Sequence, residues 1–178
     1  MHDLRPVYLR GPRVYLRAMV EGDKERGAAW LDETFPVNAA SAEVALKREH
    51  EGPWWLRSAR RLAIALGEDD EMVGSARVTS HDWQRTCRLA FAMAPWRDDR
   101  DVLRAEALGL LVHWLRDESE LMTVTAEIAA DQPASIAAAE ALGMVRNGRL
   151  REWFARPGTR VDCLLYQALN PRWEVRDA

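Results

Sequence analysis

The segment at residues 122–144, MTVTAEIAADQPASIAAAEALGM, decides the fold of this chain. Its first eight residues alternate and are rich in Val, Thr and Ile, a pattern that favours a half-buried strand over a helix. Residues 131–133 (DQP) supply polar capping atoms followed by a proline, which predicts the start of a helix. Gly143 predicts the end of that helix, because glycine adopts the left-handed conformation that closes it. The segment is therefore expected to form a strand, a tight turn, a short helix and the start of a second strand.

Hydrophobic periodicity extends this pattern over the rest of the chain. Runs with a period of two residues predict strands, and apolar residues at helical spacing predict helices. The expected strands cover residues 13–19, 61–67, 72–79, 85–94, 122–129, 145–156 and 160–169, and the expected helices begin at Asp23, Ser41, Asp101 and Pro133. Ser41 is expected to cap the second helix. The sequence therefore predicts a mixed, mostly antiparallel sheet of about seven strands with four helices, in the order βααβββαβαββ.

Composition sets the broad class of the protein. A chain of 178 residues with 48% hydrophobic residues is expected to form one domain over residues 1–178. The net charge of −3 gives no bulk attraction to nucleic acid or to an anionic membrane, so neither partner is expected. No apolar run reaches the length of a membrane span, and the first residues lack the apolar core of a signal peptide, so a cytoplasmic location is expected.

The two cysteines and the four histidines show no metal-ligand spacing, and no metal site is expected. Cys87 and Cys163 lie on expected strands, and both are interpreted as small core residues. The alternative for Cys163 is a thiol close to a bound acyl group.

A family resemblance rests on the deciding segment and its neighbours. Gln132-Pro133-Ala134-Ser135, followed by Ala-Glu-Ala-Leu-Gly-Met, resembles the Asn-x-x-Ser … Glu-Lys-Leu-Gly-Phe signature of GNAT N-acetyltransferases. The nearest subgroup is the RimJ/RimL-like one, which acts on ribosomal-protein N-termini. Residues 9–17 (LRGPRVYLR) look like the opening strand of that subgroup, and residues 161–173 (VDCLLYQALNPRW) look like its last strand and the Trp that follows. The resemblance covers residues 9 to 173 and implies an α/β (α+β) GNAT fold.

The resemblance implies transfer of an acetyl group from acetyl-CoA, the only co-substrate expected, to a primary amine. In the family the pyrophosphate lies on a Gly-rich loop before the third helix, and residues 96–107 (WRDDRDVLRAEA) correspond to it here. Both loop glycines are absent, at Arg100 and Val102, so arginine side chains are expected to bind the phosphates instead. The expected cofactor-binding residues are Met93, Ala94, Arg97, Arg100, Asp101, Val102, Leu103, Arg104, Gln132 and Ser135. The alternative is a GNAT fold without catalysis that binds a ligand or a protein.

The resemblance and the residue chemistry also suggest the groups that react. Ser135 is a candidate donor to the departing thiolate, although a serine in the first turn of a helix often bonds only to backbone. Glu127 and then His81 are candidate bases for the amine, each with an ordinary surface charge as the alternative. Trp54 and Trp55 are candidates for an aromatic wall at the acceptor site or, alternatively, for core packing. The acceptor is a protein N-terminus or a small amine, and a homodimer is possible through an edge strand.

Overall fold

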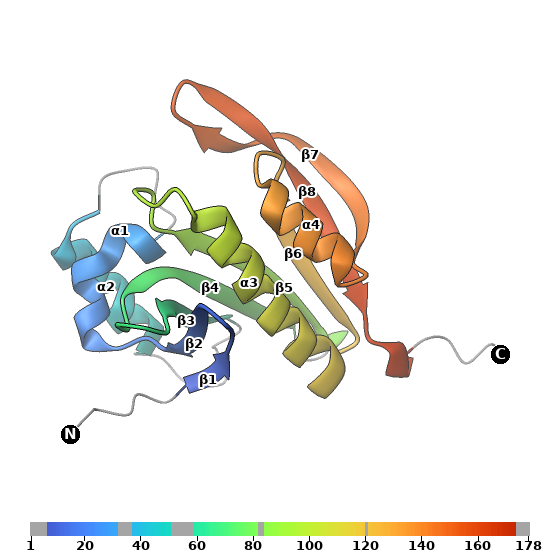
Figure 1. Cartoon of the computed structure of the whole chain (residues 1–178), viewed down its shortest axis with the longest axis horizontal. Helices are drawn as coiled ribbons and strands as arrows, with labels where there is room; N and C mark the ends of the chain where they lie inside the picture. The colour runs from blue at the N-terminus through green and yellow to red at the C-terminus, as the bar shows by residue number, and fades with distance from the viewer. Residues whose placement is uncertain (1–6, 32–36, 51–58, 82–83, 120, 174–178) are drawn as a thin grey trace.

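One mixed sheet organises the chain. The computed structural model describes residues 7–31, 37–50, 59–81, 84–119 and 121–173 (Figure 1). Eight strands follow the order β1-β2-β3-β4-β5-β6-β8-β7, and only the neighbours β5 and β6 run parallel. The strands are β1 (Val7–Arg10), β2 (Val14–Ala18), β3 (Ala59–Leu66), β4 (Met72–His81), β5 (Thr86–Met93), β6 (Thr123–Ala129), β7 (Val145–Arg156) and β8 (Thr159–Leu169). The expected mixed and mostly antiparallel sheet is confirmed, with eight strands instead of about seven.

The additional strand is β1, which sequence analysis did not separate from the segment that leads into β2. A tight turn separates the two strands, and Gly11 N–H donates to Val14 O at 2.8 Å. Glu106 on the third helix holds this turn, because its Oε1 accepts from the backbone N–H groups of Arg13 and Val14 at 2.8 and 2.9 Å. Periodicity within one segment does not reveal a turn that a distant carboxylate stabilises.

The four expected helices are present; the last begins at Pro133 as expected, and the other three begin at different residues. They are α1 (Gly27–Trp30), α2 (Ala39–His50), α3 (Arg100–His113) and α4 (Pro133–Ala141). A 3-10 turn (Glu21–Arg26) precedes α1, so the first α-helix begins later than Asp23. Ser41 is not the cap of α2: its N–H donates to Asn38 Oδ1 at 2.9 Å, and Asn38 N–H donates to Ser41 Oγ at 3.1 Å. No helix in the described part of the chain is long and apolar enough to span a membrane.

Two hydrophobic clusters lie on opposite faces of the sheet. The larger cluster packs α3 and α4 against one face and includes Ile64, Leu108 and Tyr166. The smaller cluster packs α1 and α2 against the other face and includes Ala63 and the fully buried Trp30. Ala63 and Ile64 are neighbours on β3, and successive side chains of a strand point to opposite faces. The helices α3 and α4 lie side by side over one face (Figure 1), and the other face is left to the N-terminal helices.

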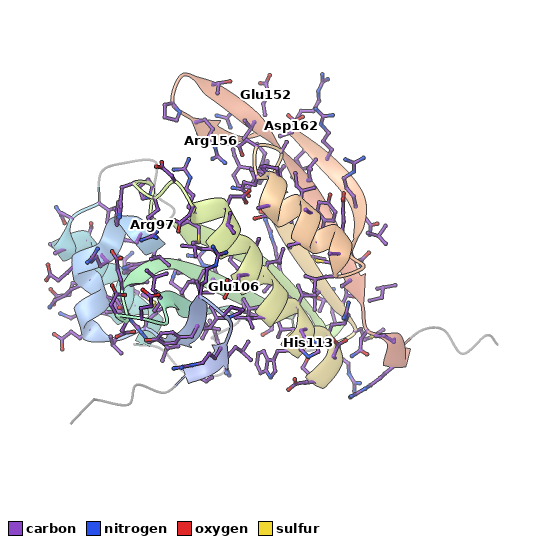
Figure 2. All side chains as sticks on the ribbon, in the orientation of Figure 1. Arg97, Glu106, His113, Glu152, Arg156 and Asp162 are labelled. Carbon is purple, nitrogen blue, oxygen red and sulfur yellow. The ribbon has the colours of Figure 1, made fainter. Side chains whose placement is uncertain are left out.

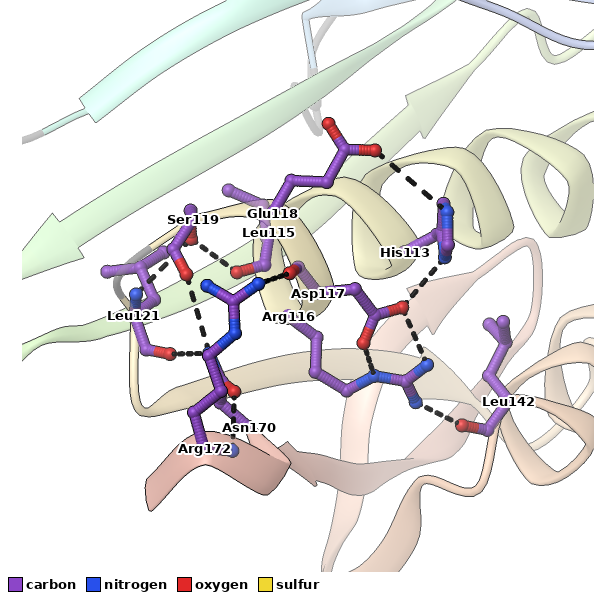
Figure 3. Close-up of polar contacts among 10 residues, drawn as sticks. All are labelled: His113, Leu115, Arg116, Asp117, Glu118, Ser119, Leu121, Leu142, Asn170 and Arg172. Carbon is purple, nitrogen blue, oxygen red and sulfur yellow. Dashed lines mark hydrogen bonds and ion pairs between the residues drawn. The ribbon is translucent and has the colours of Figure 1, made fainter.

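Polar contacts fix the C-terminal ends of α3 and α4 (Figure 3). Arg116 follows α3 in a short π-helical turn, and its Nη1 donates to Leu142 O at the end of α4, at 2.6 Å. The buried Asn170 follows β8, and its Nδ2 donates to Leu121 O at 2.9 Å. Because these ends are tied together, the opposite, N-terminal ends of α3 and α4 are held at one place beside the sheet.

Candidate functional site

The parallel strands β5 and β6 separate partway along their length. They pair from Thr86 with Thr123 to Leu89 with Ala126, and no later pair joins them within the described residues. β5 continues to Met93 against β4, and β6 continues to Ala129 against β8. Backbone polar groups that face the neighbouring strand in the paired part therefore face a gap in the unpaired part. The two strands therefore form a fork, which is open beyond Leu89 and Ala126.

Both helix N-termini lie at the open end of the fork. α3 begins at Arg100 soon after β5 ends, and α4 begins at Pro133 soon after β6 ends. Asp101 links the two starts: its carboxylate accepts from Ala134 N–H at 2.8 Å and from Ser135 N–H at 3.2 Å. It also accepts from the Ser135 hydroxyl at 2.6 Å. A carboxylate from α3 thus occupies the positive N-terminal end of α4.

The expected cap of α4 by residues 131–133 is wrong. Gln132 makes no side-chain cap bond to the helix, and its Oε1 accepts from Ala129 N–H at 3.1 Å. Asp131 receives two hydrogen bonds from Arg156 of β7, at 2.8 and 3.0 Å, and these bonds lower the pKa of Asp131. The proline at the first helical position and the closing Gly143, with φ of +74°, are confirmed.

The arginines near the start of α3 differ in how they are engaged. Arg97 donates to both carboxylate oxygens of Asp99, at 2.8 and 2.9 Å, and this pair raises the pKa of Arg97 and lowers that of Asp99. Arg100 donates to the Pro95 carbonyl at 2.8 Å. Arg104 lies deeper, with 11% of its side chain exposed, and its shortest ion pair is the 3.8 Å contact with Asp101. Arg97 is labelled in Figure 2, beside the first turn of α3.

Burial is the main reason why the pKa of Arg104 is lowered to about 10; the charge of Asp101 opposes this shift, and the charges of Arg156 and Arg100 add to it. The guanidinium remains charged near neutral pH. No hydrogen bond of Arg104 is found within the described residues, although Arg97 and Arg100 both have close acceptors. Arg104 is therefore the loop cation that is best placed to gain from a phosphate.

On the face away from α3 and α4, one ion pair spans the closed end of the fork. Glu127 is the first β6 residue beyond the last pair with β5, and 13% of its side chain is exposed. Arg88 of β5 donates to its carboxylate across the two strands. Ala90 is the β5 residue next to Arg88 on this face, and its small side chain leaves the ion pair accessible along the strand. A carboxylate that can accept a proton therefore lies at the point where the strands part.

Both cysteines are buried and have free thiols. Burial raises the pKa of Cys87 to about 12. Burial and then the charge of Glu127 raise the pKa of Cys163 to about 11. Because a thiolate is the reactive form of cysteine, neither residue is suited to attack a thioester near neutral pH. The interpretation of both as small core residues is confirmed by their burial.

Other sequence candidates fall in different places. Ser135 is fully buried, and its hydroxyl is engaged by Asp101. His81 is exposed at the end of β4, where it pairs with Thr86, and this is the closed side of the fork. Trp54 and Trp55 lie outside the described residues.

The remaining cofactor candidates differ in how much of their side chains is exposed. Met93, Ala94 and Leu103 are buried, and Ala94 N–H donates to Val73 O at 2.8 Å. Val102 is 43% exposed on the first turn of α3. A branched side chain at this position occupies the surface that a glycine would leave open to a ligand.

Sequence reasoning missed two arginines of the site. Arg88 follows the buried Cys87 in a strand of period two, so its position on the open face was readable, but its partner Glu127 is 39 residues away. Arg156, labelled near the projecting hairpin in Figure 2, joins the end of β7 to the turn before α4 through Asp131, across 25 residues of sequence. The sequence carries no local signal for either pair.

The arrangement suits an elongated ligand with an anionic head. The head would lie near Arg104 and the α3 N-terminus, the thin part would follow the exposed backbone of β5, and the reacting end would lie near Glu127. A reaction at that end that releases a proton needs a group to accept it, and the carboxylate of Glu127 is positioned to do so.

Comparisons with known proteins agree with this geometry. A family model described as an acetyltransferase (GNAT) domain matches residues 8–145. A crystal structure of a candidate acetyltransferase from Sphaerobacter thermophilus is 54% identical, covers 95% of this chain and 99% of its own, and has a TM-score of 0.73. A search of curated proteins found no match.

Two more distant structures show the fold alone. Mycobacterium smegmatis RimJ, in complex with CoA-disulfide, is 16% identical with a TM-score of 0.69, over 96% of this chain and 88% of its own. Vibrio cholerae spermidine/spermine N-acetyltransferase SpeG, in complex with manganese ions, is 16% identical with a TM-score of 0.68, over 93% of this chain and 98% of its own.

Proposed function

This chain belongs to the GNAT family of acetyltransferases, and from that premise we propose that it transfers an acetyl group from acetyl-CoA to a primary amine. The observation that carries the proposal is the fork between β5 and β6, which leads from two helix N-termini to a carboxylate. The buried Arg104 at the open end of the fork also supports the proposal.

In the proposed reaction the amine nitrogen attacks the thioester carbonyl directly. The C–N bond forms, the C–S bond of the tetrahedral intermediate breaks, and CoA leaves as a thiolate that takes up a proton. Glu127 receives the proton lost by the amine, directly or through a water molecule. No acyl-enzyme is formed, which agrees with the raised pKa of both cysteines.

The cofactor phosphates are proposed to bind through side chains. In place of the loop glycines stand Arg100 and Val102, whose side chains limit the approach of a phosphate to the backbone N–H groups. Arg104 and Arg100 supply positive side-chain charge for the phosphates instead. Arg97 can contribute only by giving up its paired hydrogen bonds to Asp99. Ser135 remains a candidate donor to the thiolate, and that role would require its hydroxyl to leave Asp101.

Calorimetric titration of acetyl-CoA and of CoA into the purified protein tests this proposal. We expect micromolar binding that falls at least tenfold in Arg104→Ala, a loss of about 1.4 kcal/mol, because a phosphate contact of a guanidinium is removed. Arg97→Ala is the matched control, with a change of less than about threefold expected. If neither acetyl-CoA nor CoA binds at millimolar concentration, the enzyme proposal is refuted. A GNAT fold without catalysis that binds a ligand or a protein is then favoured.

Several finer expectations stay proposals. They are the RimJ/RimL-like subgroup, the single domain over residues 1–178, the cytoplasmic location, and His81, Trp54 and Trp55 as site residues. A homodimer is proposed through β7, which forms one edge of the sheet. Size-exclusion chromatography with light scattering tests this last point.

A further inference from the structure

Positive side chains line the open face of the sheet beside the fork. Arg61 of β3 is directly opposite Arg77 of β4, and Arg77 is opposite Ala90 of β5. Arg88 precedes Ala90 by one step on the same face. Among the described residues of β3 to β6 on this face, Glu127 is the one carboxylate. Among these described strand residues, arginines outnumber carboxylates on this face.

The three arginines differ in accessibility. Arg61 donates to Trp30 O at 2.7 Å and to Ser75 Oγ at 3.0 Å, so its guanidinium is held beneath α1. Arg77 is exposed. Arg88 has 52% of its side chain exposed and lies against Glu127. Arg88 is thus the cation nearest to the carboxylate that would receive the proton of the amine.

We propose that the acceptor is a zwitterion of the amino-acid type, whose carboxylate binds Arg88 while its ammonium binds Glu127. This inference rests on the proposed acetyltransferase function and names its substrate class. Ala90 and Ala92 keep the adjacent stretch of β5 free of bulky side chains.

A zwitterion is favoured because the ion pair between Arg88 and Glu127 must be replaced before Glu127 can accept a proton from the amine. An acceptor ammonium that binds Glu127 takes the partner of Arg88, and a partly desolvated charge left without its partner is costly. An acceptor that brings its own carboxylate replaces both halves of the ion pair at once. A polyamine satisfies Glu127 but adds positive charge beside Arg77 and Arg88, and repulsion between like charges disfavours it.

Matched acceptors test this class. Acetylation by the wild-type protein would be measured with free amino acids, with the corresponding amino-acid amides, with spermidine and with a short peptide that has a free N-terminus and an amidated C-terminus. We expect kcat/KM for an amino acid to exceed that for its amide at least tenfold, with spermidine and the peptide at or below the amide. Comparing an acid with its amide removes the anionic group and leaves the side chain unchanged.

Arg88→Ala assigns the effect to a residue. Because Arg88 also pairs with Glu127, the rate with either acceptor can change in this variant, and the readout is the ratio of kcat/KM for the amino acid to that for its amide. We expect this ratio to fall at least tenfold, so that the preference disappears. Circular dichroism and acetyl-CoA binding show that the variant is folded. Arg151→Ala, on the exposed surface of β7, is the control and should keep the preference.

The possible failures are distinguishable. Equal rates for acid and amide, or a preference that survives in Arg88→Ala, would overturn the zwitterion inference and leave the acetyltransferase function standing. Preferential acetylation of spermidine or of the peptide would have the same effect. No acetylation of any acceptor would overturn both, and the titration with acetyl-CoA would then show whether cofactor binding had failed first.

Discussion

Substitution of Asp101 tests whether one carboxylate holds α3 and α4 together at the fork. In Asp101→Ala, two backbone N–H groups and the Ser135 hydroxyl lose their acceptor. A hydrogen bond to a charged group contributes about 1.5–3 kcal/mol, and loss of a helix cap costs about 0.5–2 kcal/mol. The full sum of these free energies is not expected, because water reaches part of the site: 21% of the Asp101 side chain is exposed. We therefore expect a decrease of about 3 kcal/mol in the free energy of unfolding.

Urea unfolding followed by circular dichroism measures this loss. With a slope of about 2 kcal/mol/M, the midpoint should fall by about 1.5 M in Asp101→Ala. Asp101→Asn keeps one carbonyl oxygen as acceptor and should lose about half as much. Asp98→Ala is the matched control: Asp98 is exposed in the same loop, and its replacement should change stability by less than about 0.5 kcal/mol. A midpoint for Asp101→Ala within about 0.25 M of wild type would refute the capping role.

Two further predictions concern the C-terminal end of the helices. Asn170→Ala should cost about 1–3 kcal/mol in urea unfolding, because the Leu121 carbonyl loses a buried donor at 2.9 Å; an unchanged midpoint would mean that water replaces the amide. Hydrogen bonds from Arg116 lower the pKa of Asp117. The folded-state pKa is then below that of the unfolded chain, so the pair stabilises the fold above about pH 4 and its contribution is lost as the pH falls through the lowered pKa. Thermal unfolding of Asp117→Asn should therefore show a smaller loss of stability than wild type between about pH 4 and pH 2, and parallel curves would contradict this origin.

The element order was predictable because each element carries its own signal. Alternation in residues 122–129, a proline at 133 and a glycine at 143 define the strand and helix of the deciding segment without reference to any other part of the chain. The β1 strand was missed because its turn depends on Glu106, more than ninety residues away. Hydrophobic periodicity reflects interactions within one segment, so it does not reveal a contact between residues that are far apart in the sequence.

The site was predictable in position but less so in its contacts. The position of Glu127 on the face away from α3 and α4 follows from the strand period, whereas the separation of β5 and β6 beyond Leu89 and Ala126 has no signal in the sequence. Sequence reasoning ranked the loop arginines only by position. The structure separates them, because Arg97 is neutralised by Asp99, whereas Arg104 is buried beside a single carboxylate at 3.8 Å. Which cation keeps its charge available depends on neighbours that only the fold brings together.

The two helix N-termini at the fork therefore have different uses. A helix N-terminus attracts one anion strongly, and Asp101 already supplies that anion to α4 from within the chain. An incoming phosphate would meet the charge of Asp101 at α4 and is left with α3, where Val102 limits close approach to the backbone. In the proposed binding mode Arg104 supplies the contact instead, since a guanidinium makes paired hydrogen bonds at a distance from its own backbone. If the proposed phosphate site is correct, the absence of the loop glycines and the burial of Arg104 are thus two parts of one arrangement, in which side-chain charge acts where close approach to the backbone is limited.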